Sequence, residues 1–303
     1  MAGFCGRQWI TPFKKQCFVV VGASINMAQI GLVMGFAAVL LPQLRAEDSI
    51  IHIDDSSGSW VAALPGFALL IGNLAVPTLM AKLGRRKANL ISIVIVILGW
   101  VCIVTAQNIS WLLVARALQG LSSGMSSCLT PILIGEYTSP KNRGSFTILM
   151  SFIMATGTLT VHTVGAYFTW KVTALVITIV SVIDLLIVIL SPETPSWLAD
   201  QARYEECEKV FRWLRGDDED EELNKLIQAS IVARQSSINS SSPRRVMGYI
   251  STVKKKEFYK PIIIMIHLYT MGHWGGINIL APYIVDTVHH TVGKDYDTAL
   301  IVL

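Results

Sequence analysis

Residues 118–143 read LQGLSSGMSSCLTPILIGEYTSPKNR, and this stretch joins a glycine-containing apolar segment to charges near its end. Gly120 and Gly124 are small enough to allow another helix to approach closely, as small residues do where helices meet within a membrane. Glu136 and Arg143 follow the apolar part, and a carboxylate among guanidinium groups can form charge-assisted, bidentate hydrogen bonds. The stretch therefore predicts a closely packed membrane helix that ends in a charged cluster.

The whole chain has the composition of a membrane protein. Of its 303 residues, 52% are hydrophobic and 15% are charged, whereas soluble domains carry about 25% charged residues. The net charge of +4 is too small to indicate binding to nucleic acid. The five cysteines have no metal-type or redox spacing. We predict no metal, no cofactor and no nucleic-acid partner, and no constellation of residues indicates an enzyme.

Apolar segments long enough to cross a bilayer recur along the chain. A hydrocarbon core about 30 Å thick requires about 20 apolar residues in a helix. Seven segments meet this requirement, at 16–44, 56–81, 88–106, 111–134, 144–170, 172–191 and within 260–286. Between the last two lies a charged segment, 192–260, for which we predict amphipathic helices over 204–215 and 219–234 and a flexible linker over 236–242.

The distribution of lysine and arginine predicts that the N-terminus lies in the cytoplasm. With this orientation the outer segments carry only Arg45, Lys171 and Lys294 of the 25 lysine and arginine residues, and all others except the intramembrane Arg116 lie on the cytoplasmic side. That asymmetry follows the positive-inside rule. It argues against a seven-helix receptor, whose N-terminus would lie outside. We expect an integral membrane protein of the plasma membrane, and we make no prediction of its oligomeric state.

Five positions in 118–143 stand at the spacing of a known family signature, namely Gly120, Gly124, Leu133, Glu136 and Arg143. The stretch resembles the signature of the sugar porter family of the major facilitator superfamily. LGRR (83–86), PETPSWL (192–198) and GGIN (275–278) are similar to the family's segments after its second helix, after its sixth helix and in its seventh. Ser59-Trp60 and RWLRG (212–216) are similar to insect members, including facilitated trehalose transporters.

The resemblance implies an all-α membrane protein of the major facilitator fold, which has two halves of six helices each. On this basis we expect a cytoplasmic N-terminus over 1–17, an N-terminal six-helix bundle over 18–191 and an intracellular helical segment over 192–260. Residues 261–303 would contain the seventh helix and the beginning of an eighth. Most of the C-terminal half would then be absent, as in a fragment or a truncated form.

For function, the resemblance implies facilitated diffusion of a neutral sugar, such as trehalose or a hexose, by alternating access. Asn278 matches the family's sugar-binding asparagine of helix seven. His273 and Trp274 stand near the family's glutamine pair and are candidates for a hydrogen bond and a stacking face. Ser151 stands where the family has its helix-five glutamine. The alternative is a truncated family member that does not transport and acts by interaction.

In proton-coupled members of the family an acid follows a Gly-aromatic pair in helix one. Here Ala37 follows Gly35 and Phe36, so the resemblance disfavours proton coupling. Gly31 and Gly35 are also expected to allow close packing of the first span. Asn108 begins a glycosylation sequon on the outer side, but it lies too close to the membrane surface for us to expect its use.

Charged residues form the remaining candidate site. We expect Arg85, Arg86, Glu136, Arg143 and Glu193 to form a network at the cytoplasmic ends of the helices. Such a network would lock the helix ends in one conformation and release them in another.

Two fixed charges lie within the predicted spans, Arg116 and Asp184. An uncompensated charge near the bilayer centre costs at least about 2.5–3.5 kcal/mol, so each is expected to face the bundle interior and to have a partner there. Arg116 would bind a structural ion or backbone carbonyls. Asp184 would have a packing or helix-capping role, with a proton relay as the alternative.

Overall fold

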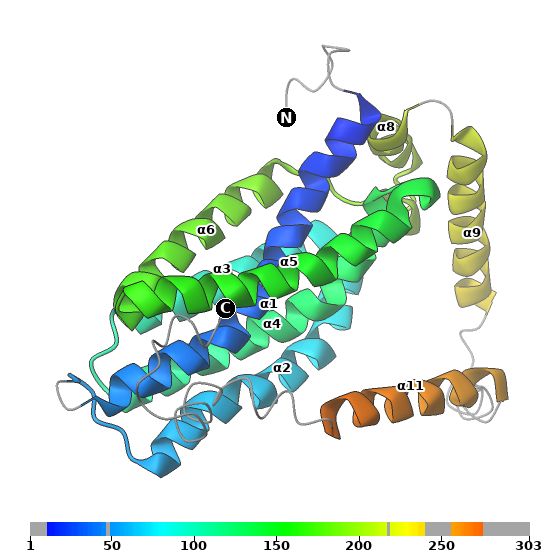
Figure 1. Ribbon diagram of the computed structural model, residues 1–303. Coiled ribbons are helices and arrows are strands. Elements are labelled where there is room, and N and C mark those ends of the chain that lie inside the picture. The colour runs from blue at the N-terminus through cyan, green and yellow to red at the C-terminus, as the bar shows by residue number, and fades with distance from the viewer. Residues whose placement is uncertain (1–10, 47–48, 217–218, 240–255, 275–303) are drawn as a thin grey trace.

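The computed structural model describes residues 11–46, 49–216, 219–239 and 256–274, and all regular structure within these ranges is helical (Figure 1). Six long helices form a bundle in which neighbours along the chain mostly run in opposite directions (Figure 1). They are α1 (Pro12–Arg45), α2 (Asp55–Leu83), α3 (Arg85–Val104), α4 (Ile109–Tyr137), α5 (Pro140–Tyr167) and α6 (Trp170–Leu190). Four more helices follow, α7 (Pro195–Asp200), α8 (Tyr204–Arg215), α9 (Asp220–Asn239) and α11 (Lys256–Trp274).

The helices begin where side chains can satisfy their free N–H groups. Asp54 precedes α2, and its carboxylate accepts a hydrogen bond from the Ser57 N–H in a capping box. Asn108 caps α4 by accepting from the N–H of Trp111 at 3.0 Å. The cap uses the Oδ1 atom of Asn108.

Five helices of the bundle are long and apolar enough to cross a membrane, namely α1, α2, α3, α5 and α6. α4 is 29 residues long and contains the charged Arg116 and Glu136 as well as several serines and glycines between its apolar residues. It packs against α1, α2 and α3. The first six predicted spans each correspond to one helix of the bundle. The seventh corresponds to α11 as far as Trp274, and the rest of it lies outside the described residues.

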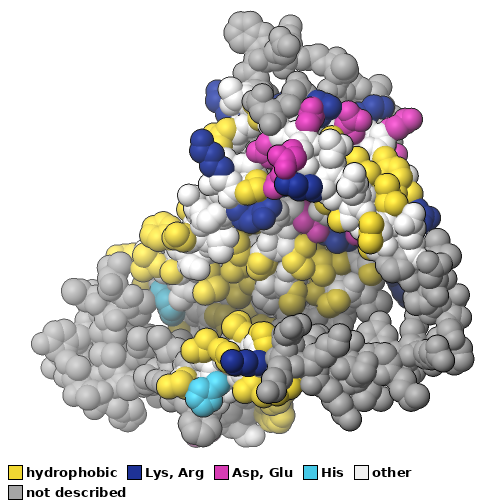
Figure 2. Space-filling model, turned by 90° about the vertical axis from the view of Figure 1, so that its right-hand side faces the viewer, with side chains coloured by type: hydrophobic (Ala, Val, Ile, Leu, Met, Phe, Trp, Pro, Cys, Tyr) yellow, Lys and Arg dark blue, Asp and Glu magenta, His cyan; other side chains and the backbone are white. Residues whose placement is uncertain are grey.

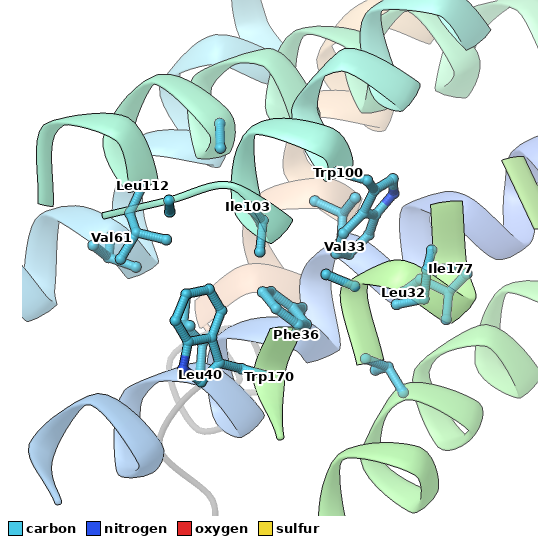
Figure 3. Packing of buried hydrophobic residues seen from close by; sticks show 14 of the residues in the cluster. Leu32, Val33, Phe36, Leu40, Val61, Trp100, Ile103, Leu112, Trp170 and Ile177 are labelled. Atoms are coloured by element: carbon cyan, nitrogen blue, oxygen red, sulfur yellow. The ribbon is translucent and has the colours of Figure 1, made fainter. Parts of the chain in front are cut away.

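Apolar side chains from the bundle helices meet in its interior. Figure 3 shows residues of α1, α3 and α6 converging around Phe36. The rings of Phe36 and Trp100 meet edge to face, with centroids 5.1 Å apart, an arrangement that aromatic pairs prefer. Trp100 donates its indole N–H to Gln29 Oε1 at 3.1 Å, and Gln29 Nε2 donates to Ser181 Oγ at 2.7 Å. These bonds satisfy polar groups that the core would otherwise leave unpaired.

Glycines allow the helix backbones to come close together. A Cβ atom on Gly120 or Gly124 of α4 would collide with the backbone of Pro65 or Leu69 of α2. Gly31 of α1 meets the backbone of α5, and a Cβ on Gly35 would lie 2.7 Å from Cγ1 of Val161. The four glycines singled out from the sequence therefore all lie where two helices touch.

The segment after α6 packs onto one end of the bundle, which we call the charged end: it is where α1 begins and where α2 and α4 end. Gln16 of α1 donates to the Leu214 carbonyl at 3.1 Å, and the ammonium group of Lys15 lies 5.3 Å from the centre of the Trp213 ring. Figure 2 shows side chains of both charges gathered on the upper part of the molecule, with hydrophobic side chains below.

The amphipathic helix expected over 204–215 is α8, with the same bounds. Its buried residues are Cys207, Phe211 and Leu214. The linker expected over 236–242 is in part wrong, because α9 continues to Asn239. Serine costs a helix only a few tenths of a kcal/mol relative to alanine, so the serines do not by themselves end α9. Figure 1 shows α11 to one side of the six-helix bundle.

Candidate functional site

The residues predicted to bind sugar are only partly within the described structure. Ser151 lies on an exposed face of α5. His273 and Trp274 are the last two residues of α11, and the positions of their side chains are not described. Asn278 lies outside the described residues. Of the four predicted sugar contacts, Ser151 is therefore the one whose side chain the structure describes.

Ser151 shares its face of α5 with two further neutral polar residues, Thr158 and His162. With 3.6 residues per turn, the three side chains fall within about 40° of one another around the helix axis. Thr158 Oγ1 donates to the Gly31 carbonyl of α1 at 3.2 Å. His162 Nε2 lies 3.3 Å from the position that a Cβ on Gly35 would take. Thr158 was not predicted from the sequence, although its spacing of seven residues from Ser151 places both on one face of a helix.

The opposite flank of α5 has a different chemistry. There α5 and α6 diverge around an apolar groove of about 290 Å³. Its lining, which includes Gly157, Val161 and Ile177, contains no charged residue. The stripe and the groove therefore lie on different sides of α5, and no Asp, Glu, Lys or Arg lines either of them.

At the charged end, Arg85 and Glu136 form an ion pair between α3 and α4. Nε and Nη2 of Arg85 lie 3.2 and 3.1 Å from Oε1 of Glu136. Both side chains are less than one fifth exposed, and Arg85 Nη2 also lies 3.9 Å from Asp200 of α7. Water therefore screens the pair only weakly, and the pair holds the start of α3 against the end of α4.

In this structure Glu136 pairs with Arg85 and not with Arg143. Arg143 is exposed on the first turns of α5, and no ion pair with it is found within the part of the chain that the structure describes. The chain turns at Thr138 and Ser139 before α5 begins. Glu136 and Arg143 instead line a common cavity of about 250 Å³. Arg85, the first residue of α3, reaches the carboxylate instead.

Arg86 and Glu193 each satisfy the free end of a helix. Glu193 Oε1 accepts from the Arg86 N–H at 2.9 Å and from the Thr194 N–H at 3.1 Å, which places a negative charge at the N-terminus of α3. The Arg86 guanidinium donates to the carbonyls of Val188 and Ile189 at the C-terminus of α6. Both charges complement the helix dipoles.

The backbone conformation and close contacts at position 84 explain why the LGRR motif has a glycine there. Its φ of +96° lies in the region that favours glycine. A Cβ atom there would collide with the carboxylate of Glu193 and lie 3.2 Å from the ring of Trp197. Any other residue would separate α3 from the segment after α6.

Arg215, at the end of α8, is a member of the charged network that the site prediction missed. Its Nη2 donates to the backbone carbonyls of Glu136 and Thr138 at 3.3 and 2.9 Å, which caps the end of α4. Nη1 forms ion pairs with Glu219 and Glu222, and the side chain is 5% exposed. The signal was present in the RWLRG motif, but nothing in the sequence shows which carbonyls this arginine reaches.

Arg116 is buried in the bundle and bound to neutral acceptors. Its guanidinium donates to the carbonyls of Val61 and Val33 at 3.1 and 3.0 Å and to Gln119 Oε1 at 2.9 Å. It thus joins α1, α2 and α4.

Asp184 is equally buried, with 1% exposure. Contrary to the expectation of a partner, neither of its carboxylate oxygens has a hydrogen-bond partner among the described residues.

The amino-acid sequence matches that of a known protein family. Residues 18–303 match the family model described as sugar (and other) transporter. The chain belongs to this family. It is 28% identical to the facilitated trehalose transporter Tret1 of Culex quinquefasciatus, over 95% of this chain and 56% of the relative. It is 30% identical to the sugar transporter ERD6-like 9 of Arabidopsis thaliana, over 90% of this chain and 79% of the relative.

Solved structures show that the fold is that of the major facilitator superfamily. The proton:xylose symporter XylE bound to 6-bromo-6-deoxy-D-glucose superposes with a TM-score of 0.78 at 18% identity, over 96% of this chain and 66% of that one. A partially occluded inward-open form of XylE from E. coli gives a TM-score of 0.71 at 17% identity, over 95% of this chain and 69% of that one. The predicted all-α membrane fold is confirmed. The chain spans 56% of the Culex relative and 57% of the Tret1 of Apis mellifera ligustica.

Proposed function

We propose that this chain contributes to the facilitated diffusion of a neutral sugar, such as trehalose or a hexose, across the plasma membrane. One observation carries the proposal: the stripe of Ser151, Thr158 and His162 on α5 is polar but has no fixed charge. Between Arg143 and Tyr167 the helix contains no Asp, Glu, Lys or Arg. A neutral polyol requires such donors and acceptors and no counter-charge.

The proposed sugar contacts are Ser151 on α5 and His273, Trp274 and Asn278 at and beyond the end of α11. Asparagine and serine provide hydrogen-bond donors and acceptors, and tryptophan provides an apolar face for a sugar ring. A carrier must bind weakly enough to release its substrate. A dissociation constant of about 1 mM corresponds to about −4 kcal/mol, which two or three hydrogen bonds and one stacking contact can supply.

The charged end would provide the rigid body that alternating access requires. Arg85, Arg86, Glu193 and Arg215 tie α3, α4, α6 and α8 together through ion pairs and helix caps. We assign this end to the cytoplasm, together with residues 1–17. A bundle held in this way can rock as one unit around a substrate site near the midplane.

The test is uptake of radiolabelled trehalose and D-glucose by proteoliposomes that contain the purified chain. L-glucose serves as the control for leakage. We expect saturable uptake that discriminates between the two enantiomers of glucose and persists without an imposed pH gradient. Asn278→Ala should weaken uptake through a higher KM.

Equal entry of both enantiomers, at the rate of protein-free liposomes, would contradict transport by this chain. That outcome would favour the alternative of a family member that acts by interaction.

A further inference from the structure

α2 carries a single amide side chain, Asn73, and two donors on α4 hold it in place. Asn73 Oδ1 accepts from Ser127 Oγ at 2.9 Å and from Cys128 Sγ at 3.1 Å. The Ser127 hydroxyl also lies 2.8 Å from the Gly124 carbonyl. Because both donors approach Oδ1, they fix the orientation of the amide and leave its NH₂ group facing away from them.

The amide nitrogen of Asn73 keeps its two donors free. No hydrogen-bond acceptor for Nδ2 is found among the described residues. The residue is half-buried, and Nδ2 does not belong to the buried polar atoms that lack a partner. It therefore lies where a ligand or water can reach it.

Two prolines free backbone acceptors at the same place. Pro77 stands four positions after Asn73, and Pro131 stands four positions after Ser127. A helical carbonyl accepts from the N–H four positions later, and proline has no N–H. The carbonyls of Asn73 and Ser127 therefore lack their helical donors. Both prolines are exposed, so this break in the hydrogen bonding lies at the surface of the bundle.

A further proline of α2 shows how the protein treats such a carbonyl in its interior. Pro65 frees the carbonyl of Val61 in the same way, and the Arg116 guanidinium donates to it at 3.1 Å. For the carbonyls of Asn73 and Ser127, no donor from outside the backbone of their own helices is found within the described ranges. A side chain thus fills the interior break, whereas the surface break stays open.

The open break lies at the same depth as Ser151. Asn73 and Ser127 each stand ten residues before their helix ends at the charged end, and Ser151 stands eleven residues after α5 begins there. At 1.5 Å per residue, all three lie about 15–17 Å from that end, which is the middle of a hydrocarbon core about 30 Å thick. α5 packs on α1, α1 on α4 and α4 on α2, so α1 and α4 lie between the two polar places (Figure 1).

The free groups at the break suit a neutral hydroxyl compound. Unpaired donors and acceptors are costly in hydrocarbon, so we expect a polar occupant rather than lipid. Along α2 and α4, the nearest charged residues, Lys82 and Glu136, stand nine positions further toward the charged end. An anion therefore finds no positive charge, and the amide donors disfavour a cation. A hydroxyl group donates and accepts at once, so it can bond to both kinds of free group.

We propose that the Asn73 amide and the carbonyls of Asn73 and Ser127 form a second binding site for a neutral sugar, half-way along the bundle between α2 and α4. A sugar hydroxyl accepts from Asn73 Nδ2 and donates to one of the two carbonyls. The choice of a sugar as the occupant rests on the proposed function. None of these residues belongs to the sugar contacts proposed on α5 and α11.

Cys128 is a natural reporter of this site, because its thiol donates to Asn73 Oδ1. Its reaction with a charged methanethiosulfonate can be followed in the wild-type chain in lipid nanodiscs, by mass spectrometry of the peptide that contains it. We expect trehalose or D-glucose at about 100 mM to slow this reaction, by about tenfold if the dissociation constant is about 10 mM. The measurement requires no variant to fold.

Two variants of α2 assign the protection to the amide. Asn73→Leu should abolish the protection by sugar, because it removes the amide donors. Thr78→Val, at an exposed position of the same helix outside the site, is the matched control and should leave the protection unchanged.

Three results would overturn the proposal. A Cys128 that resists the charged reagent but reacts with membrane-permeant N-ethylmaleimide would show that this flank faces lipid. Equal reaction rates with and without sugar would show that water alone fills the break. Protection by NaCl at about 100 mM, to which sugar adds nothing, would show that the ligand is a cation.

The measurement also separates this site from the proposed function. Saturable sugar uptake without protection of Cys128 would remove the second site and leave transport standing. Protection of Cys128 without uptake would support the second site and contradict transport by this chain.

Discussion

Arg85 directs Nε and Nη2 to one oxygen of Glu136, at 3.2 and 3.1 Å, and thereby joins the start of α3 to the end of α4. The two residues are 51 positions apart in sequence. At the start of α3, Arg85 thus neutralises a largely buried carboxylate.

Arg85→Gln should destabilise the bundle by about 2–4 kcal/mol, because it leaves the Glu136 carboxylate without its charged partner. Arg143→Gln is the matched control, since that exposed arginine lies on the next helix and its loss should change stability by less than about 0.5 kcal/mol. Chemical unfolding in detergent micelles measures both. Equal effects of the two substitutions would show that Arg85 is not the partner of Glu136.

Gly124→Ala should destabilise the protein by about 1–3 kcal/mol, because the new methyl group would collide with the Leu69 backbone and push α2 from α4. Gly135, on the same helix, has no atom within 4 Å of an added Cβ. Gly135→Ala should therefore be neutral or stabilising by up to about 1 kcal/mol. A thermal unfolding series separates the two, and a Gly124→Ala protein as stable as Gly135→Ala would contradict the close contact.

Arg116→Lys should cost about 2–4 kcal/mol although it keeps the charge. A lysine ammonium cannot reproduce the planar fork that reaches Val33, Val61 and Gln119 together. Arg203→Lys, at an exposed pair with Glu206, provides the control and should be nearly neutral. The unfolding midpoint in micelles reports both, and tolerance of lysine at position 116 would mean that charge alone is required there.

Cys207 should resist alkylation in the folded chain. Burial, reinforced by the neighbouring Glu208 carboxylate, raises the pKa of its thiol to about 11. At pH 8 about one thiol in a thousand is then ionised, and the thiolate is the reactive form. A variant that retains only Cys207 should react with maleimide after denaturation and hardly before it.

Because the pKa of the folded Cys207 thiol lies above that of an unfolded cysteine, its contribution to stability is present at neutral pH and is lost as pH rises through about 11. Rapid labelling of the native protein at pH 8 would show that α8 does not bury this thiol.

The sequence alone determined the elements of this protein. Runs of apolar residues of bilayer length give the six helices of the bundle, since hydrocarbon leaves a backbone no alternative to internal hydrogen bonds. The glycines and charges of 118–143 gave the family, and the amphipathic pattern over 204–215 gave α8 with its bounds. These are local properties, and neighbours in sequence are enough to specify them.

Only the tertiary structure decided which partners these residues have. Glu136 pairs with Arg85 rather than Arg143, and Arg116 reaches carbonyls on two other helices. Asp184 faces Gly22 of α1 without a hydrogen-bond partner among the described residues. Each outcome depends on the register in which helices far apart in sequence pack together. That register is set by side-chain shape over the whole contact, such as Gly124 against Leu69, and not by the local pattern that makes each segment a helix.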